Sequence, residues 1–183
     1  MPIIAIVVVL VVLIIGWVIG AYNALVRLKN KVKANWAQID VVLKRRADLI
    51  PNLVETVKGY AKHESNTLEA TVAARNKYMD AKDPAAQMQA SGELTQALGR
   101  IMMLSESYPD LKADTSFLQL QGELKDTEDK IQYARQFYND AVYAYTNKQE
   151  VFPSSVISNM FHFEKFEMFQ ATEQDKVVPK VEF

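Results

Sequence analysis

Residues 3–21 read IIAIVVVLVVLIIGWVIGA, an unbroken apolar run apart from its glycines, and the first charged residue is Arg27. As a helix rising about 1.5 Å per residue, the run is roughly 28 Å long, close to the hydrocarbon thickness of a bilayer. A cleaved signal peptide usually opens with basic residues before a shorter apolar stretch, and nothing basic precedes this run. We therefore predict that residues 1–21 form a retained transmembrane anchor in the lipid bilayer.

Basic residues follow the run at Arg27, Lys29, Lys31 and Lys33. The positive-inside rule then places the rest of the chain in the cytoplasm, as part of a single-pass protein of a bacterial plasma membrane. Gly16 and Gly20 have the G-x-x-x-G spacing, which lets two membrane helices approach closely, so we expect anchor packing at these glycines and a homo-oligomer.

Composition excludes several classes of function. The 183 residues carry 21 basic and 22 acidic side chains, so no bulk charge favours a nucleic-acid partner. There is no cysteine, and therefore no disulfide, thiolate metal site or thiol nucleophile. The two histidines, His63 and His162, lack the spacing of a zinc-protease or di-iron motif. We predict no enzyme activity, no cofactor and no metal.

Beyond the anchor, apolar residues recur every three or four positions, which is the period of a helix. We expect helices over about 22–61, 64–81 and 84–108, and a fourth opening with a capping box at Ser116 and Gln119. The first should continue the anchor and kink or restart at Pro51. Asp83 and Pro84 suit the start of the third helix, and residues 110–114 form a turn.

The fourth helix has the clearest period. Its apolar positions alternate by three and four residues, which favours near-parallel packing against another long helix; they are Phe117, Leu120, Leu124, Thr127, Ile131, Ala134, Tyr138, Ala141 and Tyr145. The first helix is the other element long enough, and its expected stripe runs from Leu25 to Tyr60. We predict an all-α fold: a transmembrane helix continuing into an up-and-down four-helix bundle over residues 22–150.

Arg46 interrupts the apolar stripe of the first helix, where an unpaired cation would be costly. We expect a buried ion pair with a carboxylate of the fourth helix, Glu128 being the favoured candidate over Glu123, Asp126 and Asp129. Two interpretations stay open for the surrounding segment: a structural pair that fixes helix register, or an exposed docking patch around the proline, made of Lys44, Arg45, Asp48, Pro51 and Asn52.

The C-terminal tail, residues 151–183, holds six of the eight phenylalanines. Antiparallel helix order would bring its start back to the bilayer. The rings could close the bundle, or they could contact lipid or a partner protein; the candidate contacts are Phe161, Phe163, Phe166 and Phe169.

Several segments resemble the LemA family. The motif YNALVRLKNKVKANWAQIDVVLKRRADLIPNLVETVKGYAKHE covers residues 22–64, FLQLQGELKDTEDKIQYARQFYNDAVYAY covers 117–145, VFPSS covers 151–155, and PKVEF closes the chain. The resemblance implies an N-terminal anchor and a helical bundle but no reaction. Some family members resemble lipoproteins with a cysteine before the YN pair, where this sequence has Ala21, and such members would place their domain outside the cytoplasm.

Taken with the helical pattern, these features predict a membrane-anchored scaffold or adaptor that acts through self-association and partner docking. An accessory or regulatory subunit of another membrane protein, such as an enzyme or protease complex, is the alternative. A native mass measurement in mild detergent would separate the two.

Overall fold

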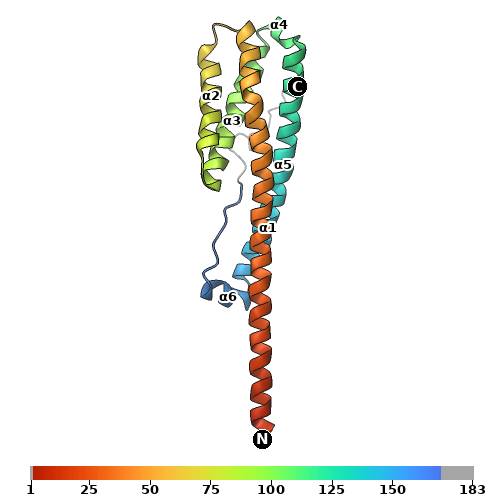
Figure 1. Cartoon of the computed structure of the whole chain (residues 1–183), viewed down its shortest axis with the longest axis vertical. Helices are drawn as coiled ribbons and strands as arrows, with labels where there is room; N and C mark the ends of the chain where they lie inside the picture. The colour runs from red at the N-terminus through yellow and green to blue at the C-terminus, as the bar shows by residue number, and fades with distance from the viewer. Residues whose placement is uncertain (1, 170–183) are drawn as a thin grey trace, which may run out of the picture. The chain divides into compact units, whose positions relative to one another are not determined.

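The computed structural model describes residues 2–169, and within them it contains helices and no strand. The closing PKVEF motif and Phe183 lie outside the described residues. The helices are α1 (Pro2–Tyr60), α2 (Ser65–Asp80), α3 (Pro84–Ser105), α4 (Pro109–Lys112), α5 (Thr115–Glu150) and α6 (Ser154–Met160) (Figure 1). The prediction of an all-helical chain with one long apolar N-terminal helix is confirmed.

Two compact units divide the described chain. Unit 1 contains residues 2–37 and 136–168, and unit 2 contains residues 38–135 together with Phe169. Helices α1 and α5 each contribute one part to each unit.

Helix α1 begins with the predicted anchor. Its most apolar 18-residue window has a mean hydropathy of 3.3 and no buried residue, so α1 is long and apolar enough to cross a membrane. The predicted restart at Pro51 does not occur, because α1 is one continuous helix through the proline.

The structure shows how unit 2 accommodates Pro51. Proline has no N–H, so the carbonyl of Ala47, four residues earlier, loses its helical donor. The Nε of Arg75 on α2 donates to that carbonyl at 3.0 Å. Since Ala47 is fully buried, this bond satisfies an acceptor that water does not reach.

A single apolar core holds the helices of unit 2 together, with residues from α1, α2, α3, α4 and α5: Ile50, Leu53, Val57, Ala61, Leu68, Leu94, Leu98, Ile101, Leu111, Phe117 and Leu124. On the apolar face predicted for α1, Leu43, Ile50 and Val57 are buried, whereas Tyr60 at the end of the stripe is 42% exposed. The Tyr60 hydroxyl donates instead to Asp114 at 3.0 Å.

Aspartate side chains cap the first turns of two helices in unit 2, α3 and α5. As predicted, Asp83 caps α3 by accepting from the Ala86 amide at 2.9 Å, and Pro84 takes the first turn. The capping box at Ser116 and Gln119 was wrong: Asp114 accepts from the Phe117 amide at 2.8 Å. The expected turn over 110–114 overlaps the short helix α4, Pro109–Lys112.

Unit 1 has its own smaller core, formed by the end of the anchor, the C-terminal half of α5 and α6. Ala21, Leu25 and Val32 of α1 are buried in it. So are four α5 side chains and one from α6, namely Tyr138, Ala141, Val142, Tyr145 and Ile157. The core begins at Ala21, the last residue of the predicted span.

Candidate functional site: a tail seat in unit 1

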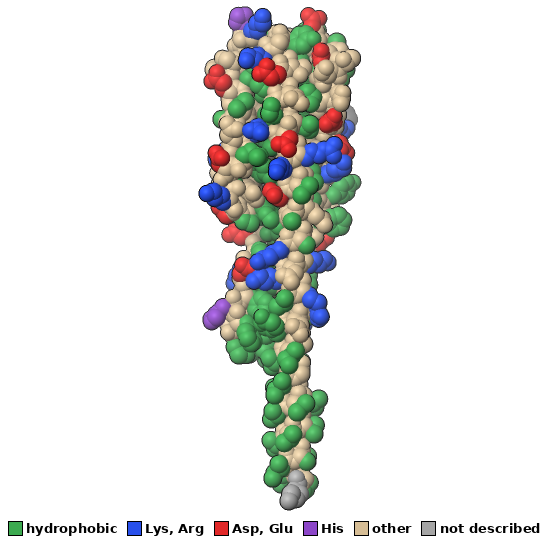
Figure 2. Space-filling model, in the orientation of Figure 1, with side chains coloured by type: hydrophobic (Ala, Val, Ile, Leu, Met, Phe, Trp, Pro, Cys, Tyr) green, Lys and Arg blue, Asp and Glu red, His purple; other side chains and the backbone are tan. Residues whose placement is uncertain are grey.

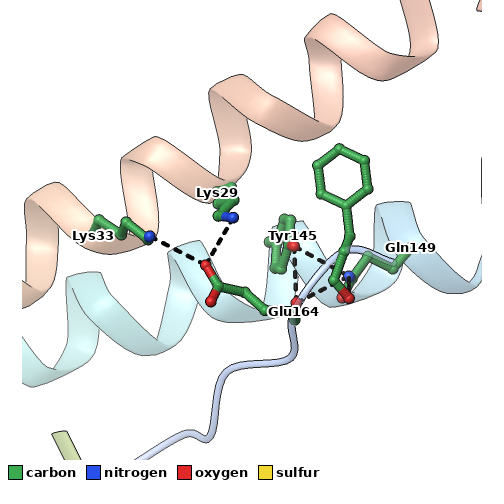
Figure 3. A network of polar contacts seen from close by, with 6 residues as sticks. Lys29, Lys33, Tyr145, Gln149 and Glu164 are labelled. Atoms are coloured by element: carbon green, nitrogen blue, oxygen red, sulfur yellow. Dashed lines mark hydrogen bonds and ion pairs between the residues drawn. The ribbon is translucent and has the colours of Figure 1, made fainter. Parts of the chain in front are cut away.

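The tail segment 163–167, which follows α6 without helical structure, is held by polar side chains of α5. The Tyr145 hydroxyl donates to the Glu164 carbonyl at 2.9 Å, and the Tyr138 hydroxyl donates to the Glu167 carbonyl at 3.0 Å. Gln149 Nε2 lies 3.2 Å from the Glu164 carbonyl and 3.3 Å from that of Phe163. We call this set of α5 donors, with Lys29 and Lys33 of α1, the tail seat; Figure 3 shows Tyr145, Gln149 and the two lysines around Glu164.

Helical spacing explains why these donors act together. Tyr138, Tyr145 and Gln149 are seven and four residues apart, so they lie on one face of α5. Burial raises the pKa of the Tyr145 phenol to about 12, with a further contribution from the Glu164 carboxylate. Burial likewise raises the pKa of Tyr138, with a smaller contribution from Glu167. Both phenols therefore stay protonated donors at neutral pH.

Glu164 also holds this segment through its charged side chain. Its carboxylate lies 2.9 Å from Lys29 Nζ and 3.2 Å from Lys33 Nζ, two lysines one helical turn apart on α1 (Figure 3). The hydrogen bond from Lys29 is the largest cause that lowers the pKa of Glu164. Because the Glu164 side chain is 46% exposed, solvent screens this pair and limits its contribution.

The predicted phenylalanine contacts separate into two groups. In unit 1 the Tyr22 ring meets Phe161 and Phe163 edge-on at centroid distances of 4.9 and 5.5 Å, and Tyr145 meets Phe166 at 5.5 Å. Phe163 and Phe166 are half-buried, whereas Phe161 is half exposed. In unit 2 the Arg135 guanidinium lies 5.0 Å from the centre of the Phe169 ring, a cation–π contact.

Arg46 and Glu128 come together in unit 2. Arg46 Nη1 lies 2.6 Å from the Glu128 carboxylate and donates to Thr95 Oγ1 at 3.0 Å. Burial lowers the pKa of Arg46, the carboxylate of Glu128 opposes that effect, and the nearby charge of Arg135 adds to it. Of the other acidic candidates, Asp126 pairs with Lys130 at 2.7 Å.

The remaining predicted residues lie on open surface of α1. All five side chains of the predicted docking patch are exposed in unit 2, namely Lys44, Arg45, Asp48, Pro51 and Asn52. In the anchor, a methyl group added at Gly16 or Gly20 would meet no atom within 4 Å. Among residues 2–169, no group of three or more His, Asp or Glu side chains is arranged to hold a metal ion.

Sequence reasoning missed two parts of these sites. Tyr138 and Tyr145 were assigned to helix packing, and their hydroxyl partners are main-chain oxygens, which leave no signal in a sequence. The Arg75–Ala47 bond had a usable signal, because a proline within a predicted helix demands another donor for the carbonyl four residues earlier.

Comparison with known proteins identifies the family of this chain. The profile described as the LemA family matches residues 35–183, and the chain belongs to this family. Protein LemA of Metamycoplasma hominis is 25% identical over 160 residues, which cover 87% of this chain and 73% of that protein.

Two further relatives carry another name. Magnetosome protein MamQ 2 of Paramagnetospirillum magneticum is 24% identical over 186 residues, covering 87% of this chain and 68% of the relative. Magnetosome protein MamQ of Magnetospirillum gryphiswaldense is 23% identical over 174 residues, covering 81% of this chain and 64% of the relative. None of these names is that of an enzyme.

Proposed function

We propose that this protein is a non-enzymatic, membrane-anchored scaffold of the bacterial plasma membrane, whose copies associate through their anchors and whose helical region docks partners. The observation that carries the proposal is the open glycine face of the anchor. Gly16 and Gly20 lie one turn apart with free space beside them, so a second helix can approach the backbone there. The relatives are named after a family or the magnetosome rather than a reaction, which supports the same class of function.

The finer architecture belongs to this proposal. The anchor, residues 1–21, holds an up-and-down four-helix bundle, residues 22–150, at the cytoplasmic face, and the Phe-rich tail, residues 151–183, begins near the bilayer. The basic residues that follow the span support this orientation. We expect the bilayer and further copies of the chain as partners, and no nucleic acid.

Cross-linking in intact membranes tests self-association. We expect the full chain to give dimers and larger species, and Gly16→Leu with Gly20→Leu to reduce them strongly, because leucine side chains separate the two backbones. The matched control is Ile14→Leu with Val18→Leu, which changes side chains two positions away, about 200° around the helix. Cross-links that persist in the glycine variant at the control level would refute packing through this face.

An accessory subunit of another membrane protein is the second candidate. The exposed patch favours it, since Lys44, Arg45 and Asp48 present both charges beside Asn52 on one surface of unit 2. Native mass measurement in mild detergent distinguishes the two. Multiples of this chain alone support the scaffold, whereas one chain with a stoichiometric foreign subunit supports the accessory role.

A further inference from the structure

Helix α6 buries two serines beside Ile157 and leaves two of its large apolar side chains, Val156 and Met160, exposed. Ser154, Ile157 and Ser158 face inward and are 3%, 1% and 5% exposed. Its outer face and flanks carry large apolar side chains that are 50% to 78% exposed; these are Val151, Phe152, Val156, Met160 and Phe161. A water-facing helix buries its apolar stripe and exposes its polar one.

The inward serines have a structural reason. Ser154 Oγ lies 2.8 Å from the Lys148 carbonyl oxygen and 2.9 Å from the Val151 carbonyl oxygen, so its hydroxyl can donate a hydrogen bond to either. The Lys148 carbonyl belongs to the last turn of α5, where helical donors run out, and Val151 directly follows that helix. The Phe163 amide closes the other end by donating to the Ser158 carbonyl at 3.1 Å. The arrangement that turns the apolar side chains outward is therefore stabilised by specific bonds.

The outward apolar surface lies beside the end of the anchor. A hollow of about 300 Å³ is lined by anchor residues Trp17 and Gly20 on one side and by Lys148 and Phe152 on the other. Phe161 contacts Tyr22, the residue that follows the predicted span, at 4.9 Å. In Figure 2 hydrophobic side chains gather where α6 meets α1, continuous with those of the anchor.

We infer that residues 151–161, which we call the foot, lie in the interfacial layer of the same bilayer that the anchor spans. Large apolar and aromatic side chains at that depth are stabilised by the boundary between headgroups and acyl chains. The occupant of this surface is phospholipid. Lys148, at the edge of the hollow, presents a cation at the depth of the lipid phosphates.

A foot in the interface gives the protein a second contact with the bilayer. One transmembrane helix alone can tilt and shift along the bilayer normal, and a second interfacial contact at the anchor's end restricts both motions. The tail seat strengthens the contact, because Glu164, three residues after the foot, is paired with Lys29 and Lys33 of α1. The inference requires that the anchor spans the membrane. It does not depend on self-association or on which side of the membrane the helical region lies.

Because the chain has no cysteine, a single introduced cysteine can be labelled specifically, and the depth of that position in the bilayer can be measured. A fluorescent NBD label is attached to the full-length chain through Phe152→Cys or, independently, Met160→Cys. The matched control is Phe137→Cys, whose ring is 59% exposed in unit 1. The Phe137 main-chain carbonyl accepts a hydrogen bond from the Asn35 side chain of α1. Asn35 lies 14 residues after Ala21, or about 21 Å further along the helix.

Labelled proteins are reconstituted into vesicles of phosphatidylcholine and phosphatidylglycerol, and quenching by shallow doxyl-labelled lipid and by aqueous iodide is compared. At both foot positions we expect lipid quenching at least about threefold stronger than at position 137, with correspondingly weaker iodide quenching. Circular dichroism verifies that each variant keeps its helical content.

Two results would overturn the inference. Iodide quenching at positions 152 and 160 as strong as at position 137 would place the foot in water. Protection from iodide without quenching by doxyl lipid would mean that protein covers it. Cross-linking is read separately, so loss of self-association with a lipid-quenched foot would reject the scaffold and leave this inference intact.

Discussion

Removing either member of the Arg46–Glu128 pair should destabilise unit 2, and by unequal amounts. Breaking a buried ion pair typically costs about 3–5 kcal/mol, because the remaining charge is left without a partner. The Arg46 side chain is 5% exposed and that of Glu128 is 26% exposed. A carboxylate stranded by Arg46→Ala can therefore turn toward water, whereas a guanidinium stranded by Glu128→Ala cannot.

These exposures fix the expected magnitudes. We expect Arg46→Ala to lower the free energy of unfolding by about 2–3 kcal/mol, below the usual range because Glu128 is resolvated. Glu128→Ala should cost about 3–5 kcal/mol, since Arg46 then remains buried near Arg135 with no carboxylate. Arg46→Met with Glu128→Met should recover most of the loss, because a buried pair replaced by apolar groups is often neutral.

Thermal unfolding of the full chain in mild detergent, followed by circular dichroism, measures these differences. At roughly 2–4 °C per kcal/mol for a chain of this size, Arg46→Ala should lower the midpoint by about 4–12 °C. Arg45→Ala is the matched control on the exposed side of α1 and should cost under about 1 kcal/mol. Equal shifts for the two arginines, or a smaller shift for Glu128→Ala than for Arg46→Ala, would refute the reasoning.

Two further predictions concern other polar contacts. Arg75→Met should lower the free energy of unfolding by about 1–3 kcal/mol, because the buried Ala47 carbonyl is left without a donor. The loss should be smaller in a Pro51→Ala background, where a helical N–H is restored, and an unchanged loss there would contradict the assignment. The pKa of Glu164 is lowered below its ordinary value of 4.5, so its pairing with Lys29 stabilises the tail above that pH and is lost as the pH falls through the lowered pKa. Hydrogen exchange of the main chain over 163–167 should be slower in the wild type than in Glu164→Gln at pH 6, and the difference should shrink as the pH falls below 4.5. A difference that stays constant as the pH is lowered would contradict this assignment.

The helices could be predicted from sequence because their signal is local. The three-and-four spacing from Phe117 to Tyr145 identifies one face of a single helix, whatever packs against it. The end of a helix is less determined when two capping residues compete. Ser116 with Gln119 and Asp114 are both acceptable caps, and Asp114 is used because it also receives the Tyr60 hydroxyl.

Long-range pairing could be predicted as a requirement and a short set of candidates. Arg46 within an apolar stripe implied a carboxylate on a facing helix; Glu128, the favoured candidate, is the partner found, although three other acidic residues of α5 satisfied the requirement equally by type. Which of them meets Arg46 depends on the axial register of α1 against α5, and register is set by core side chains such as Leu53 and Leu124. No spacing within either helix contains that information.

The tail seat shows why the rest escaped prediction. Tyr138, Tyr145 and Gln149 hold main-chain carbonyls, an acceptor that every residue supplies, so the attachment places almost no demand on the tail's side chains. Glu164 is the exception, through its lysines. The side chains of this segment can therefore serve other contacts. The rings of Phe163 and Phe166 pack on tyrosines, while apolar side chains of α6 turn outward. A tail fastened by its backbone can present an apolar surface at the end of the anchor without losing its own position.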